Sequence, residues 1–197
     1  MRSSAIFSLA LLFLTLWCSG HEATGQTPRI IPTARLLTPP NEVTTASRPR
    51  RVFAFPASGL PSLSEASEIE RRAFESTNVA RAKNGLAPLA WDPALCQVAR
   101  THSASMGRQG YFAHETPDGS RLRDRVRVVG IAHFRVLGEN IAYNQGYDDP
   151  GAFAVERWMI SAGHRANILS REFDRSAIGS FVAADGSVYL TQVFIKY

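Results

Sequence analysis

The sequence predicts an α+β domain, in which helices pack on a sheet of mainly antiparallel strands. Two observations indicate this class. From Ser64 onward, apolar residues recur in several segments at the 3.6-residue spacing of helices. Later, two β-like stretches (residues 177–183 and 188–195) flank an Asp185-Gly186 pair, which is typical of a hairpin turn. Because the helical segments precede strands that gather late in the chain, we expect separate layers of helix and sheet.

The first two helices have clear boundaries in the sequence. Ile69, Ala73 and Phe74 begin a helical face, and Gly85 is a natural stop. Asp92 followed by Pro93 then predicts an N-cap and first turn of a second helix, which ends at Gly107 or Gly110.

Two further helices are predicted. Residues 120–129 form a short one that Gly130 ends. Pro150 opens another over residues 151–161, and we expect Gly163 to close it.

The N-terminal residues 1–25 have the features of a signal peptide. Arg2 is followed by an apolar run over residues 5–17, and small residues precede Gln26. The run is too short to span a bilayer as a helix, since 13 residues reach about 20 Å of the ~30 Å hydrocarbon core. Trp17 stands where a lipidation signal at Cys18 would need a small residue. We therefore expect an exported protein, secreted or periplasmic, without a transmembrane span in its mature chain.

Residues 26–63 are predicted to form a disordered linker, rich in proline and arginine, that leads into a domain over residues 64–197. The linker holds five arginines against one glutamate, so it carries +4 of the net charge of +5. The domain itself is nearly neutral, which excludes nucleic-acid binding based on overall basicity. The linker is either a solvated spacer or a segment that adheres to anionic envelope polymers.

Cys96 is the one cysteine beyond the signal peptide, so the mature chain forms no internal disulfide. We expect its side chain to be a small buried group on the second helix rather than a reactive thiol.

Four segments carry a resemblance to a known family. They contain Ala113-His114, Gly138-Glu139-Asn140, a run from Trp158 through Gly163-His164-Arg165 to Leu169, and Tyr189-Leu190-Thr191-Gln192. In this order they resemble the bacterial branch of the CAP superfamily of cysteine-rich secretory, antigen 5 and pathogenesis-related proteins, which includes the SCP-like extracellular domains. The resemblance covers residues 64–197. It implies a three-layer α-β-α sandwich with a central antiparallel sheet.

The resemblance also implies a cavity lined by two histidines and two acidic residues, which holds a divalent metal in some members. His114 and Glu139 match two of these positions. The chain departs at the others, because Ser161 replaces the second acid and Tyr189 replaces the late-strand histidine, ahead of Gln192. His164 is the candidate substitute for that histidine. The candidate cavity residues are therefore His114, Glu139, His164, Tyr189 and Gln192, with His114 and His164 as metal ligands.

Two imidazoles and a carboxylate suit a divalent metal, zinc above all, and an open position on zinc would activate water. Glu139 would be the general base if the protein were hydrolytic. The first hypothesis is a non-enzymatic binding module for an extracellular or envelope ligand, such as a small hydrophobic molecule, a peptide or a protein. The alternative is a metal-assisted hydrolase of extracellular or cell-envelope peptides or glycans.

Structural roles for the same residues are also open. Glu139 has Arg165 or Arg135 as candidate ion-pair partners, and His164 has a role in capping the preceding helix. His102 lies among apolar residues and is expected in the core. The alternating series Arg121, Arg123, Arg125 and Arg127 is expected to form a solvated face.

Overall fold

The computed structural model describes residues 33–37 and 60–197, and for residues 33–37 only the backbone. The predicted signal peptide, and most of the predicted linker, lie outside these residues. Within the residues that the structure describes, no helix is both long and apolar enough to cross a membrane.

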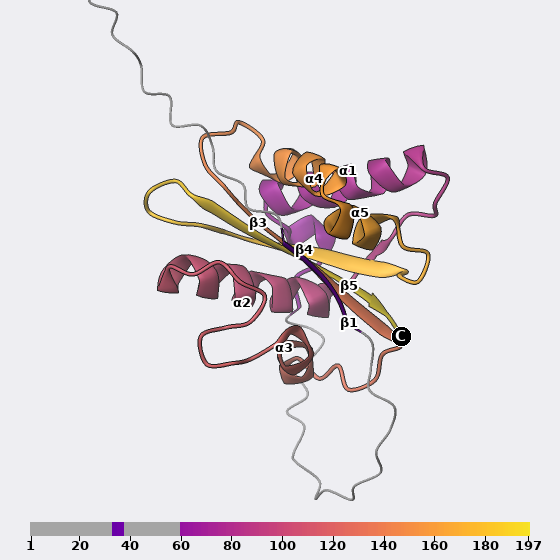
Figure 1. Cartoon of the computed structure of the whole chain (residues 1–197), viewed down its shortest axis with the longest axis horizontal. Coiled ribbons are helices and arrows are strands. Elements are labelled where there is room, and N and C mark those ends of the chain that lie inside the picture. Colours follow the sequence, from indigo (N-terminus) through magenta and orange to yellow (C-terminus); the bar gives the residue numbers. More distant parts are fainter. Residues whose placement is uncertain (1–32, 38–59) are drawn as a thin grey trace, which may run out of the picture.

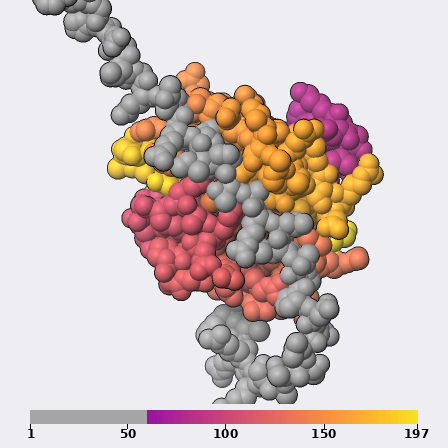
Figure 2. Space-filling model, viewed as in Figure 1, coloured from indigo at the N-terminus to yellow at the C-terminus, as the bar shows by residue number. Residues whose placement is uncertain are grey.

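The described chain forms three layers, so the α+β class and the α-β-α arrangement are confirmed (Figure 1). One face of the sheet is covered by α1 (Glu68–Lys83), α4 (Pro150–Ile160) and α5 (Ala162–Leu169). The other face is covered by α2 (Pro93–Gln109) and α3 (Leu122–Val128). Figure 2 shows the surfaces of α2 and of the α4–α5 segment as two blocks on opposite sides of the molecule.

The central sheet has the strand order β1-β3-β5-β4-β2. Its strands are β1 (Thr33–Leu37), β2 (Ala90–Trp91), β3 (Val136–Asn144), β4 (Arg175–Val182) and β5 (Val188–Lys196). The pairs β1–β3, β3–β5 and β5–β4 are antiparallel, as expected, and the two-residue strand β2 alone runs parallel to its neighbour.

The sequence located some strands and missed others. The β4–β5 hairpin forms as predicted, with Gly186 at a φ of 81° in the turn. The sequence analysis did not predict β3, although it singled out residues 138–142 as a motif. Most residues of β3 are buried on both sides of the sheet, so the strand lacks the alternation of polar and apolar residues that identifies a half-exposed strand.

The helix ends follow the predicted capping except after α4. The Asp92 carboxylate accepts hydrogen bonds from Ala94 N and Leu95 N at the start of α2, and Gly110 ends that helix with a φ of 67°. The predicted stop at Gly163 is wrong. The break comes earlier, at Ser161, whose backbone is extended, and Gly163 lies inside the next helix, α5.

Five residues of the predicted disordered linker belong to the sheet. Thr33–Leu37 pairs with β3 along its outer edge, with Arg35 opposite Glu139. The segment lacks proline, so each of its residues can donate to a neighbouring strand, and the edge of β3 offers unpaired backbone groups. A short 3-10 helix, Leu63–Glu65, begins at the last residue of the predicted linker and continues into the predicted domain.

Each face of the sheet carries its own apolar core. One core joins the sheet to α1, α4 and α5 around Trp158, and the other joins it to α2 and α3 around Leu95 and Val126. Cys96 lies in the second core, fully buried as expected, and burial raises the pKa of its thiol to about 12.

Gly179 on β4 lets the backbone of α2 lie directly on the sheet. A Cβ atom at this position would lie 2.0 Å from the backbone nitrogen of Arg100. We expect Gly179→Ala to lower the free energy of unfolding by about 3 kcal/mol, because a backbone cannot move aside as a side chain can. Denaturant unfolding measures the change. The control is Gln97→Ala, at an exposed position on α2, which should change the free energy of unfolding by less than about 0.5 kcal/mol. Equal losses in the two variants would contradict the close packing of α2 on Gly179.

Candidate functional site

Glu139 lies in the middle of β3 and faces the α2–α3 layer. Side chains alternate between the two faces of a strand. Leu137 packs in the core under α2 and α3, whereas Ala142 packs in the core under α1, α4 and α5. Glu139 therefore shares the face of Leu137, and Asn140 shares the face of Ala142. Only 1% of Glu139 is exposed, so its carboxylate needs partners inside the protein.

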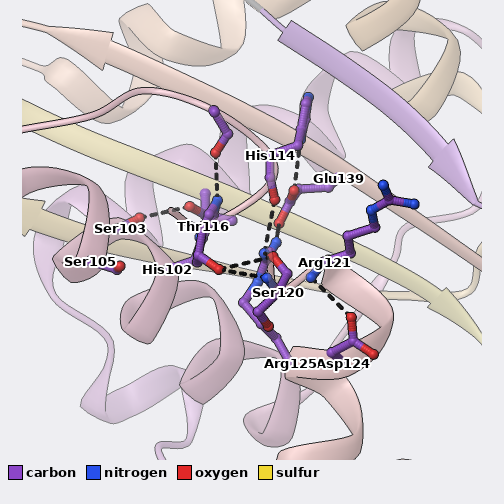
Figure 3. Close-up of polar contacts among 12 residues, drawn as sticks. His102, Ser103, Ser105, His114, Thr116, Ser120, Arg121, Asp124, Arg125 and Glu139 are labelled. Atoms are coloured by element: carbon purple, nitrogen blue, oxygen red, sulfur yellow. Dashed lines mark hydrogen bonds and ion pairs between the residues drawn. The ribbon is translucent and has the colours of Figure 1, made fainter. Parts of the chain in front are cut away.

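Both oxygens of this carboxylate are occupied (Figure 3). Oε1 accepts a hydrogen bond from His114 Nδ1 at 2.7 Å, and Oε2 accepts one from Arg125 Nη2 at 2.5 Å. Arg125 Nη1 also donates to the backbone oxygen of His114 at 2.8 Å, which closes a ring of three residues. Burial would raise the pKa of the Glu139 carboxyl, but the His114 hydrogen bond and the Arg125 charge together hold it below its ordinary value.

The buried position of Arg125 corrects the expectation of a solvated arginine face. Arg125 is only 8% exposed, whereas Arg121 and Arg127 are exposed. On α3, Arg125 shares the inward face with Leu122, three residues earlier, and lies next to the buried Val126. The pairing of Glu139 with Arg165 or Arg135 is likewise not the one observed. Sequence reasoning missed Arg125 because it read the arginines as a series and did not follow their spacing from Leu122.

His114 and His164 are each held through one ring nitrogen. His114 Nδ1 binds Glu139, and His164 Nδ1 lies 2.8 Å from Ser161 Oγ. Nε2 of both rings is buried and has no hydrogen-bond partner among residues 60–197. Burial, together with the charge of His114, lowers the pKa of His164 to about 4.

The remaining predicted residues lie apart from this group. Gln192 faces α1, where its Nε2 donates to Thr77 Oγ1 at 3.0 Å. Tyr189 lies on the Glu139 face but at the far end of the sheet, beside Tyr143, with ring centroids 5.0 Å apart. The structure thus brings His114 and Glu139 into contact. It brings neither Tyr189 nor Gln192 to that pair, and His164 lies on α5, in the helical layer on the other face of the sheet.

Asn140 links the back of β3 to α5. It donates to the backbone oxygen of His164 at 3.3 Å and accepts a hydrogen bond from Asn167 Nδ2 at 2.8 Å. Asn167 also donates to the backbone oxygen of Glu139 at 3.2 Å. This network fixes α5, and with it His164, relative to the strand that carries Glu139.

His102 on α2 is fully buried, as expected, but it also belongs to the surroundings of Glu139. Its Nε2 lies 3.0 Å from the backbone oxygen of Ala113, next to His114. Burial lowers the pKa of His102 to about 4, against the opposing effect of the Glu139 charge. Within residues 60–197, no group of three or more His, Cys, Asp or Glu side chains is arranged to hold a metal ion.

Residues 74–194 match a family model described as CAP, the cysteine-rich secretory protein family. The chain belongs to this family. The resemblance noted in the sequence is therefore confirmed, and the CAP domain accounts for the three layers described above.

Three relatives place the CAP domain among bacterial proteins. It is 40% identical over 127 residues to the uncharacterized membrane protein YlbC of Bacillus subtilis, a match that covers 64% of the chain and 34% of YlbC. It is 37% identical over 132 residues to the uncharacterized protein YkwD of the same organism, covering 67% and 49%. A crystal structure of an extracellular protein containing an SCP domain from Bacillus anthracis superposes with a TM-score of 0.57 at 32% identity, covering 66% of this chain and 40% of that one. The chain thus spans between about a third and a half of the length of these relatives.

Glu139→Gln tests the buried ion pair. The amide cannot balance the Arg125 charge, so we expect the free energy of unfolding to fall by about 3 kcal/mol or more. The control is Glu115→Gln, which breaks an exposed ion pair with Arg121 and should cost less than about 1 kcal/mol. Denaturant unfolding of both variants makes the comparison, and similar losses would show that the Glu139 pair is not a main constraint.

His102 and His164 should make the fold sensitive to mild acid. The pKa of each is about 4 in the folded protein and about 6.5 in the unfolded chain, so the unfolded chain binds more protons between these values. Stability should therefore fall as the pH drops from 6.5 towards 4, by about 3 kcal/mol per histidine at most. Unfolding of wild type and His164→Gln over this range tests the claim. The variant should show the smaller slope, and an unchanged slope would contradict it.

Proposed function

We propose that this CAP domain is a non-enzymatic binding module, and that His114 and His164 hold a divalent transition-metal ion, zinc first among them. The observation that carries the proposal is the state of the two rings. Each is fixed through Nδ1 and has a buried Nε2 without a partner among residues 60–197. Buried polar atoms are normally satisfied, so a pair of unsatisfied imidazole nitrogens suggests a group that binds there.

The tautomer of His114 suits a metal ligand. A carboxylate can only accept, so His114 Nδ1 carries the proton that Glu139 binds, and Nε2 presents a lone pair. His164 has the same arrangement when its Nδ1–H donates to Ser161 Oγ. Histidine ligands of metals commonly have such a partner behind them, which orients the ring and makes its free nitrogen more basic.

Two imidazoles make an open site. Structural zinc has four protein ligands, and catalytic zinc usually has three. A metal held by His114 and His164 would therefore have vacant positions for an external ligand, and its affinity would be modest. Such a site suits reversible binding of a metal, or of a partner that supplies the missing donors.

The arrangement of Glu139 argues against the hydrolase alternative. A general base must reach the water that it activates with a free oxygen. Glu139 is 1% exposed, and its two oxygens are taken by His114 and Arg125. Its role is to orient His114 and to balance the charge of Arg125.

Export of the protein is also part of this proposal. The relative from Bacillus anthracis is described as an extracellular protein, and residues 1–25 have the sequence features of a signal peptide. A site of two histidines that binds metal reversibly would then respond to metal in the surroundings of the cell.

Isothermal titration calorimetry of zinc binding to the purified protein tests the metal site. We expect stoichiometric binding, at least a tenfold loss of affinity in His114→Ala and in His164→Ala, and a smaller loss in Ser161→Ala. The thermal unfolding midpoint should rise with zinc in the wild type, because the proposed site would bind the metal more tightly in the folded state than in the unfolded chain.

His133→Ala is the matched control, since His133 is an exposed histidine of the same domain. Its zinc affinity should equal that of the wild type. Absence of binding in the wild type, or equal losses in all the histidine variants, would refute the proposed site.

A further inference from the structure

A hollow lies beside the Glu139 group, between α2 and the loop formed by residues 116–120. Its volume is about 570 Å³, within the ~300–1,000 Å³ range of small-molecule sites. Eight of its nine lining residues have polar side chains, and Pro117 is the exception. His102, Ser105, Thr116, Ser120 and Arg125 around it are visible in Figure 3. We refer to it as the α2 pocket.

Two lining residues of the α2 pocket carry buried polar atoms that lack a partner within residues 60–197. These atoms are His102 Nδ1 and Arg125 Nε. His102 Nε2 must donate to the oxygen of Ala113, so Nδ1 is an acceptor. Arg125 uses Nη1 and Nη2 for His114 and Glu139, which leaves Nε–H as a donor. A buried polar atom left unsatisfied costs about 1–3 kcal/mol, so a ligand that pairs with both would recover part of this cost.

The charges around the α2 pocket favour a neutral ligand. The Arg125 charge is balanced by Glu139, and His102 is uncharged at neutral pH, because burial lowers its pKa to about 4. Asp118 adds an exposed carboxylate at the loop, which binds the Thr116 hydroxyl. An anionic ligand would therefore find no unpaired positive side chain among these residues, and the Asp118 carboxylate would repel it.

The donors and acceptors point to hydroxyl groups. A hydroxyl can donate to His102 Nδ1 and accept from Arg125 Nε–H, whereas a carbonyl can only accept and an ammonium can only donate. Thr101 and Ser105 add further hydroxyls from successive turns of α2. We propose that the α2 pocket is a second binding site, separate from the two histidines of the metal proposal, and that its ligand is a small neutral saccharide.

Nuclear magnetic resonance titration of the purified protein tests this site. The probes are four neutral sugars (glucose, galactose, mannose and N-acetylglucosamine) and the anionic analogue glucuronate. We expect saturable shifts of amide signals from residues 101–120 with at least one neutral sugar, and at least fivefold weaker binding of glucuronate. No saturable shift with any neutral sugar, or tighter binding of glucuronate, would overturn the proposal.

A pair of substitutions on one helix locates the site. Thr101→Phe places a ring at the exposed rim of the α2 pocket, and should weaken binding of the sugar at least tenfold. Gln97→Phe adds the same ring one turn away, outside the lining, and should leave binding unchanged. Circular dichroism checks that both variants fold. Both should bind zinc as the wild type does, so the two proposals fail separately. Sugar binding that survives Thr101→Phe would place the site elsewhere and refute the assignment.

Discussion

The buried carboxylate of Glu139 is the constraint on which the rest of the site depends. A carboxylate that is only 1% exposed on an inner strand needs close polar partners. Arg125 on α3 and His114 in the loop after α2 are these partners. The same two contacts hold α3 against the sheet and fix the tautomer of His114. The orientation of His114 and the packing of α3 on the sheet therefore depend on the same contacts of Glu139.

The opposite face of β3 has a complementary role. Amide side chains bind β3 on this face, with Asn140, Asn167 and Gln192 all buried and hydrogen-bonded. Neutral donors and acceptors cost less to bury than ions, and they link α5 to β3 without a counter-charge. His164 owes its position to this amide network, whereas His114 owes its position to the ion pair. The candidate site thus depends on both layers of helices.

Local signals in the sequence predicted local structure well. The Asp92-Pro93 cap and the Asp185-Gly186 turn are settled by neighbours in the chain, and both form as expected. The strand β3 and the ion pair of Arg125 depend on residues far apart in sequence, so periodicity gave no sign of them. The family resemblance located His114 and Glu139 in the sequence. It could not show that Gln192 faces α1, because that depends on the parity of residues along β5.

Cys96 has a consequence for how this domain can be made and used. It is the only cysteine among residues 60–197, it is fully buried, and its thiol stays protonated at neutral pH. The domain belongs to a family named for its cysteines, yet its packing needs no covalent cross-link. Folding therefore requires neither an oxidant nor a disulfide isomerase, and thiol reductants have no bond to cleave in it. The domain should reach the same structure in the reducing interior of a cell as outside it.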